Sequence, residues 1–189
     1  GNDLIRTYME RDYIVPEKFE DFVYIGLVLQ GHGMRHGMEA HRRNRPYCMG
    51  TLYWQYNDCW PVVSWSSIDY LGNWKASQYQ AKRSFEPFLF SVEQKENQYQ
   101  LFVINDENRS YSGELELELI DFNGKVNWSF NKSVSVYDNA SEVVYAFGDE
   151  IFKGSGKNST FLKATLKDSD QLKTQHFFFC SPKEMILPK

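Results

Sequence analysis

Residues 45–75 read RPYCMGTLYWQYNDCWPVVSWSSIDYLGNWK, and four of the chain's five tryptophans lie in this stretch. An ordinary hydrophobic core does not need indoles packed so densely beside polar side chains such as Asn57 and Asp58. An aromatic ring offers an apolar face and a polar edge, which suits a ligand that is itself both apolar and hydroxylated. The stretch therefore predicts a sugar-binding site, and its tryptophans are Trp54, Trp60, Trp65 and Trp74.

Composition excludes several other classes of ligand. The formal net charge is −4 and the sequence pI is about 5.6, so the chain lacks the basic footprint of a nucleic-acid-binding protein. The local basic run His41–Arg45 is better explained as the end of a helix, where cations offset the negative end of the dipole. No apolar run approaches the roughly 20 residues of a membrane span. We expect a soluble chain without nucleic-acid or membrane partners.

Within the first 87 residues, the sequence has helical periodicity up to about Arg43 and again from Trp74. A short helix is predicted over Asp3–Tyr13, and a long one from Pro16 to about Arg43, with acidic residues in its first turn. Glycine is costly inside a helix, so glycines there indicate close packing against another backbone. The long helix contains four such residues, Gly26, Gly31, Gly33 and Gly37.

The segment after the long helix is predicted to form a strand, a loop and a helix. Cys48–Trp54 lacks polar alternation, as does a strand buried on both faces. Asn57–Asn73 is too long and irregular for a simple turn, and loops of this size tend to be functional. Helical periodicity returns over Trp74–Phe85 and ends at Pro87.

From Phe88 onward, short runs alternate apolar and polar residues between turn signals. The Asn123-Gly124 pair is the strongest hairpin signal. Seven such strands in about 100 residues predict an immunoglobulin-like β-sandwich, without the paired cysteines of antibody domains. The predicted strands are Phe88–Lys95, Gln98–Asn105, Gly113–Asp121, Val126–Tyr137, Glu142–Gly148, Thr160–Lys167 and Gln175–Cys180.

The tryptophan-rich stretch also resembles a known family. Met49–Gln55, Asn57–Pro61, Ser64–Tyr70 and Gly72–Ala76 are similar to the end of the catalytic domain in β-mannosidases of glycoside hydrolase family two. The resemblance implies an α+β chain. Residues 1–87 would be the last helices and eighth strand of a (β/α)8 barrel, and residues 88–189 a seven-stranded immunoglobulin-like accessory sandwich.

The same resemblance implies that the catalytic residues lie outside this chain. A (β/α)8 barrel needs about 250 residues, so 189 residues beginning Gly1-Asn2-Asp3 are expected to be a piece of a longer enzyme. The family uses two glutamates, one after an Asn and one after a Ser. This sequence has no Asn-Glu pair, and its only Ser-Glu, Ser141-Glu142, lies in the predicted sandwich. Both catalytic glutamates are therefore expected upstream, and the chain alone is expected to be inactive.

Three residues remain as candidates for substrate binding. The resemblance implies that Trp54 closes one side of the subsite for the terminal sugar. Asn57 and Asp58 either bond sugar hydroxyls or shape the turn, and the sequence does not decide between these roles. The other tryptophans of the stretch are expected to anchor the long loop and the last helix. No cofactor or metal is implied, and the expected partner is a β-mannoside, with self-association of the isolated chain.

Several alternatives remain open. His32, His36 and Glu39 share one helical face and could bind a metal, although a solvated face is the better explanation. Another family-two activity, such as that of a β-galactosidase, and a non-catalytic carbohydrate-binding sandwich are the rival functions. In the carbohydrate-binding sandwich, the rings that stack on the sugar would come from Tyr99, Tyr111, Trp128, Tyr137 and Tyr145. Cys48, Cys59 and Cys180 are expected to be free, largely buried thiols. The compartment stays open among periplasmic, secreted and lysosomal.

Overall fold

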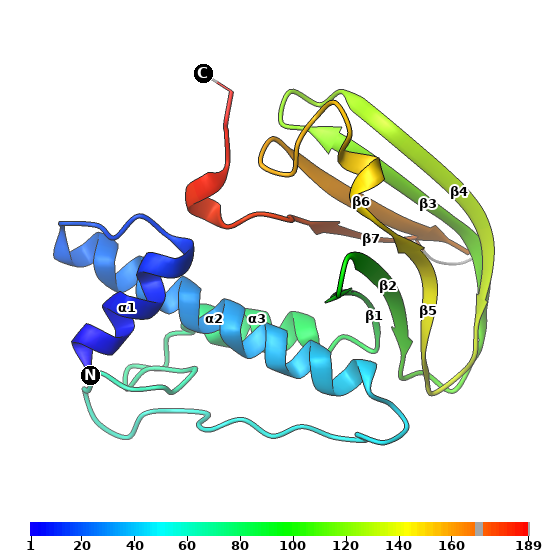
Figure 1. Cartoon of the computed structure of the whole chain (residues 1–189). Coiled ribbons are helices and arrows are strands. Elements are labelled where there is room, and N and C mark those ends of the chain that lie inside the picture. The colour runs from blue at the N-terminus through cyan, green and yellow to red at the C-terminus, as the bar shows by residue number, and fades with distance from the viewer. Residues whose placement is uncertain (169–171, 189) are drawn as a thin grey trace. The chain divides into compact units, whose positions relative to one another are not determined.

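The computed structural model describes residues 1–168 and 172–188. The fold is α+β and divides into two compact units, Gly1–Glu86 and Pro87–Lys189 (Figure 1). The first unit holds the three α-helices, and the second holds the β-strands with two short 3-10 helices, Asp149–Phe152 and Pro182–Glu184. None of the described helices is long and apolar enough to cross a membrane.

The helices of the first unit are α1 (Asn2–Asp12), α2 (Phe19–Arg43) and α3 (Ala76–Ser84). In α2, acidic residues occupy the first turn and His41, Arg42 and Arg43 the last, so both ends complement the helix dipole. The prediction that this helix begins at Pro16 is wrong by three residues. Its first turn is closed by the hydrogen bond from the Phe22 amide to the Lys18 carbonyl, at 3.0 Å.

The four glycines of α2 differ in whether they pack closely against another backbone. A Cβ atom at Gly31 would lie 3.2 Å from the carbonyl carbon of Ala76, so this glycine lets α2 approach the backbone of α3. At Gly26 a Cβ would make only an ordinary contact with Met9, at 3.8 Å. At Gly33 and Gly37 it would meet nothing within 4 Å, and the prediction is wrong for both.

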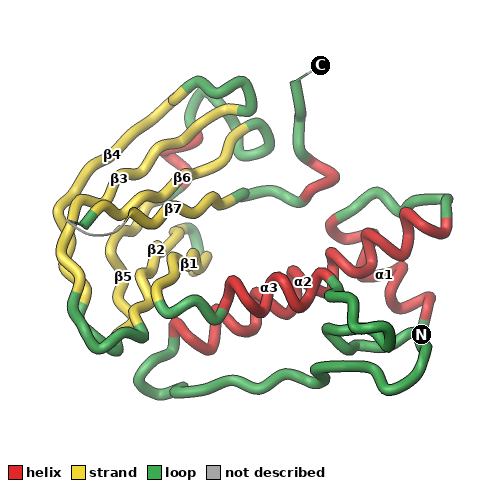
Figure 2. Tube along the Cα trace, turned by 180° about the vertical axis from the view of Figure 1, so that it is seen from behind, coloured by secondary structure: helices red, strands yellow, loops and turns green. Residues whose placement is uncertain are grey.

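The predicted strand over Cys48–Trp54 is not formed. Residues 48–53 are drawn as loop (Figure 2), and no described residue pairs with them as a neighbouring strand. A strand exists only through hydrogen bonds to a neighbour, so an apolar run without one remains irregular. The loop that follows is tied by isolated bridges of Ile68 with Asn57 and with Trp74.

The second unit is a β-sandwich of two antiparallel sheets (Figure 2). One sheet has the order β1-β2-β5 and the other the order β4-β3-β6-β7. In the described residues the strands are β1 (Phe88–Lys95), β2 (Gln98–Asn105), β3 (Tyr111–Asp121), β4 (Val126–Val136), β5 (Ala140–Phe147), β6 (Thr160–Lys167) and β7 (Leu172–Phe177). The Asn123-Gly124 pair turns β3 into β4, and Gly124 has φ +89°, a conformation that favours glycine.

The sandwich core follows from period-two alternation. In β3, Leu115, Leu117 and Leu119 are fully buried, while the glutamates between them lie on the opposite face. They join apolar side chains from the other six strands in one cluster, against which Trp128 packs while partly buried. Of the rings proposed as a sugar platform, Tyr99 and Tyr111 are buried, Trp128 and Tyr145 are partly buried, and Tyr137 is exposed. This burial favours a structural role for Tyr99 and Tyr111.

The three cysteines are free thiols. Cys48 and Cys180 are half-buried, but Cys59 is exposed, so the prediction of burial is wrong for Cys59. It lies in the irregular loop, whose apolar side chains face outward.

Candidate functional site

The three predicted binding residues, Trp54, Asn57 and Asp58, lie close together in the chain but differ in their exposure to solvent. Trp54 is 74% exposed, and the peptide bond that joins it to Gln55 is cis. Asn57 is exposed as well, and its amide nitrogen makes one long hydrogen bond, 3.3 Å, to the Asp58 carbonyl. Asp58 is only 7% exposed. Trp54 and Asn57 are therefore accessible to a ligand, whereas Asp58 belongs to the loop interior.

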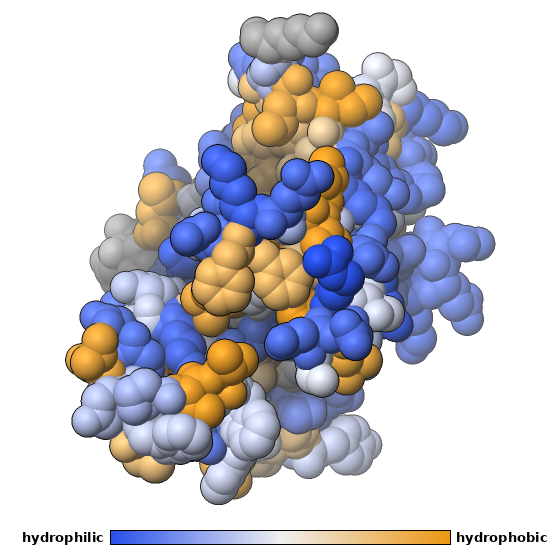
Figure 3. Space-filling view, turned by 90° about the vertical axis from the view of Figure 1, so that its left-hand side faces the viewer, coloured by the Kyte–Doolittle hydropathy of each residue, from blue (hydrophilic) through white to orange (hydrophobic). Residues whose placement is uncertain are grey.

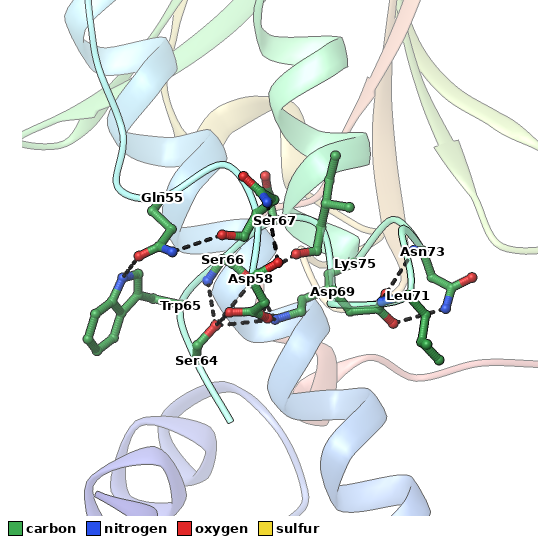
Figure 4. Close-up of polar contacts among 12 residues, drawn as sticks. Gln55, Asp58, Ser64, Trp65, Ser66, Ser67, Asp69, Leu71, Asn73 and Lys75 are labelled. Carbon is green, nitrogen blue, oxygen red and sulfur yellow. Dashed lines mark hydrogen bonds and ion pairs between the residues drawn. The ribbon is translucent and has the colours of Figure 1, made fainter. Parts of the chain in front are cut away.

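Asp58 is the centre of a hydrogen-bond network inside the loop (Figure 4). The Ser64 hydroxyl donates to its Oδ1 at 2.5 Å, and the Ser66 hydroxyl to its Oδ2 at 2.6 Å. The Lys75 ammonium lies 2.9 Å from the same Oδ2 and 2.7 Å from the Ser66 hydroxyl. Lys75 is the residue directly before α3, so the network ties the beginning of the loop to the helix that ends it.

The same contacts set the charge state of Asp58. Hydrogen bonds from Ser64 and then Ser66, with the nearby Lys75 ammonium, lower the pKa of this carboxyl to about 2. A carboxyl that is ionised at neutral pH and accepts three donors has little capacity for a proton or a sugar hydroxyl. Of the two roles left open for Asp58, the geometry favours shaping the loop.

A second network joins the loop to α3. The Tyr53 hydroxyl lies 3.1 Å from both the Ser67 hydroxyl and the Gln78 amide oxygen, and Ser67 also donates to the Gln78 oxygen at 2.8 Å. Ser67 is 1% exposed and further contacts the Tyr56 carbonyl. Sequence reasoning did not identify Ser67 or Gln78, because a serine and a glutamine 11 residues apart carry no pattern that predicts contact.

A third chain of hydrogen bonds orients Trp65. Its indole nitrogen donates to the Gln55 amide oxygen at 3.2 Å, and the Gln55 amide nitrogen donates to the Asn57 carbonyl at 2.8 Å. The Gln30 side chain of α2 donates to the Trp65 carbonyl at 2.7 Å. The sequence placed Gln55 beside Trp54 at the end of the predicted strand but did not predict its contact with Trp65.

The loop exposes apolar side chains around this polar interior. Trp60 and Trp65 are each 60% exposed and Trp74 is 43% exposed. As expected of residues that anchor the loop and the last helix, Trp65 is hydrogen-bonded to Gln55 and Trp74 packs edge-on against Tyr79 of α3. Figure 3 shows, on one face of the molecule, hydrophobic patches that interrupt the hydrophilic surface. A depression of about 310 Å³ is lined by Asp58, Pro61, Val62, Asp69, Tyr70 and Leu71.

Asp69 does not add a free carboxylate to this depression. Its Oδ1 accepts the backbone amides of Leu71 and Asn73, and its Oδ2 accepts the Asn73 side-chain amide. The hydrogen bonds from Asn73 are the main reason that the pKa of Asp69 is lowered. The described loop therefore offers aromatic and amide groups for binding, but its two carboxylates are committed to its own structure.

The metal alternative on α2 finds no support in the geometry. The Nδ1 atom of His32 lies 2.8 Å from the Tyr13 hydroxyl, and Glu39 pairs with Arg35 at 2.6 Å. Burial is the main cause that lowers the pKa of His32. Within residues 1–168 and 172–188, no group of three or more His, Cys, Asp or Glu side chains could hold a metal ion.

Comparisons with known proteins agree with this architecture. Residues 97–184 match the family described as Mannosidase Ig/CBM-like domain. The β-mannosidase of Mus musculus is 29% identical over the whole chain, which covers 20% of that protein. The β-mannosidase of Capra hircus is 40% identical over 102 residues, 47% of this chain and 12% of the goat protein.

A solved structure gives the same result in three dimensions. The β-D-mannosidase of Dictyoglomus thermophilum superposes with a TM-score of 0.89 at 28% identity, over all of this chain and 23% of that one. The chain spans about a fifth of the length of the first curated relatives that it matches. The resemblance carried by the tryptophan-rich stretch is confirmed: this chain is similar along its whole length to part of known β-mannosidases, and residues 97–184 match the Mannosidase Ig/CBM-like domain family.

Proposed function

We propose that this chain is the carboxyl-terminal part of a longer retaining exo-β-mannosidase that hydrolyses terminal β-mannosyl residues. Residues 1–87 would end its (β/α)8 barrel, and residues 88–189 would be an accessory sandwich. Similarity along the entire chain to β-mannosidases, at 29% identity in sequence and a TM-score of 0.89 in structure, supports this assignment. The paired glutamates of the mechanism, about 5 Å apart in a retaining enzyme, would come from the preceding part of the protein.

The observation that carries the proposal within this chain is the contrast between Trp54 and its surroundings. Trp54 is largely exposed, yet the segment that follows it is fixed by the Asp58 and Ser67 networks. An exposed ring on a rigid support costs little ordering when a sugar stacks on it. In this proposal Trp54 stacks on the terminal mannosyl ring, Asn57 contacts its hydroxyls, and Asp58 holds the loop that presents both.

The test uses the longer enzyme that contains this chain. Trp54→Ala should lower kcat/KM on an aryl β-mannoside by about 2–4 kcal/mol in transition-state terms, because the ring that positions the terminal sugar is lost. The thermal melting temperature should stay close to that of the parent, since the side chain is mostly exposed. Normal kinetics with a lower melting temperature would instead make Trp54 a packing residue and exclude this site assignment.

The rival carbohydrate-binding sandwich has less support. Such a module needs exposed, coplanar rings, and the tyrosines of β2 and β3 proposed for it are buried in the core. The sandwich is therefore assigned a structural role in the longer enzyme.

A further inference from the structure

Trp65 combines two properties that rarely occur together. Its side chain is 60% exposed, but its indole nitrogen donates to the Gln55 amide oxygen, and its backbone carbonyl accepts a hydrogen bond from Gln30. Figure 4 shows the ring extending away from the Asp58 network, with Gln55 as its contact. A free surface tryptophan would sample several rotamers, whereas this ring is restricted before any ligand arrives.

The hydrogen bond to Gln55 also decides what the exposed part of Trp65 can offer. The only polar atom of an indole is its N–H donor, and here that donor is already bonded within the loop. The exposed remainder is an apolar aromatic face. Such a face suits the C–H side of a sugar ring better than a hydrogen-bonding group.

The position of Trp65 indicates which sugar that would be. Gln55, which accepts the hydrogen bond from the Trp65 indole, directly follows Trp54 in the chain, and both indole side chains are exposed. Resting on the proposed function, in which Trp54 stacks on the terminal mannosyl ring, we propose that Trp65 stacks on the sugar attached to that residue. Trp65 would then select glycans over mannosides with a small leaving group, with Gln55 as its positioning residue.

The experiment compares two substrates in the longer enzyme, β-1,4-mannobiose and methyl β-mannoside. Trp65→Ala should reduce kcat/KM for mannobiose about tenfold more than for the methyl glycoside, as expected for loss of one apolar contact surface. Trp65→Phe, which keeps an aromatic face, should restore most of the preference. Gln55→Leu, which removes the acceptor of the indole N–H, should shift the ratio in the same direction by a smaller factor.

Trp60→Ala is the matched control, because Trp60 is equally exposed and its indole is not held by Gln55. It should leave the substrate ratio unchanged. An equal effect of Trp65→Ala on both substrates, or an equal shift from Trp60→Ala, would overturn the inference while the proposed function stands. If the unmodified enzyme hydrolyses neither mannoside, the proposed function itself fails.

Discussion

At the scale of single residues, Asp58 explains how an exposed aromatic surface can be rigid. The carboxylate collects three donors from residues 6, 8 and 17 positions later in the chain, so one side chain closes the whole loop. Charge-assisted hydrogen bonds of this kind are stronger than neutral ones. The loop backbone that carries the outward-facing apolar side chains is therefore held by hydrogen bonds, although these side chains do not form a core.

The first prediction concerns the pH dependence of the loop structure that the Asp58 hydrogen bonds hold together. The pKa of Asp58 is about 2 in the fold and near its ordinary value of 3.8 in the unfolded chain. The unfolded state therefore binds the proton first, and the stabilisation by Asp58 is complete above about pH 4 and lost as pH falls toward 2. We expect the indole N–H resonance of Trp65 to lose its folded position over this window.

Asp58→Asn should weaken the loop already at pH 7 and remove the transition between pH 4 and 2. Asp121→Asn is the control, because Asp121 also has a lowered pKa, caused chiefly by the Lys125 amide, but lies in the sandwich. An acid transition at Trp65 that persists in Asp58→Asn would contradict the assignment.

At this scale the sequence singles out residues that belong to a motif, but it does not predict the contacts that support them. Trp54 and Asn57 belong to a recognisable run and both are exposed in this chain, and their role in binding stays a prediction. The contacts of Ser64, Ser66 and Gln55 were not predicted, because they are hydrogen bonds between residues that are separated in the chain. A serine or glutamine in a loop has the same local appearance with or without such a partner.

At the scale of elements, the strands predicted from a clear sequence periodicity are the ones whose bounds agree with the structure. β1, β2 and β6 have the bounds that their sequence alternation predicted, although β1 is buried on both faces over its first four residues. Cys48–Trp54 was predicted as a strand from its lack of polar alternation and from the family resemblance, and the described residues provide it with no partner strand. Apolar content indicates only that a segment is buried, whereas alternation also indicates that the segment forms a strand.

The second prediction uses the glycines of α2. Gly33→Ala should stabilise the helix by up to about 1 kcal/mol, because alanine is the better helix former and the new methyl meets nothing within 4 Å. Gly31→Ala gains the same propensity but places its methyl 3.2 Å from the backbone of Ala76, so its net effect should be destabilising. Denaturation followed by helical circular dichroism measures both, and equal effects of the two substitutions would refute the packing argument.

The third prediction concerns β4. Trp128→Ala should lower the stability of the sandwich by about 1–3 kcal/mol, less than for a fully buried aromatic, because Trp128 packs on the core while partly exposed. Tyr137→Ala should change it by less than about 0.5 kcal/mol, since that ring is 71% exposed. Urea unfolding of the two variants compares them directly, and similar losses would remove Trp128 from the core.

At the scale of the whole molecule, the two units differ in what they bury. The sandwich has a continuous core, whereas the described buried apolar side chains of Gly1–Glu86 are only Met9, Tyr13, Met38 and Ala81. The first unit also exposes large apolar side chains, including Leu52, Val63 and Leu71. Apolar surface of this extent favours association.

The fourth prediction is therefore that the units of the isolated chain differ in stability. Amide hydrogen exchange should be slow in β2, β3 and β6 and faster in α1 and α3, because opening the first unit exposes little buried area. The chain should also self-associate as its concentration rises, which analytical ultracentrifugation detects. Uniform protection across both units in a dilute monomer would contradict the difference.

The last prediction concerns activity. We expect the isolated chain not to hydrolyse aryl β-mannosides, because retaining hydrolysis needs an acid/base and a nucleophile, both carboxylates, about 5 Å apart. Asp58 and Asp69 are ionised and committed to the loop. Glu142, the only glutamate preceded by a serine, accepts the Tyr137 amide at 2.9 Å in the sandwich and so stabilises a turn. Hydrolysis by the purified chain above the uncatalysed rate, abolished by Glu142→Gln or Asp58→Asn, would show that a catalytic centre lies within these 189 residues.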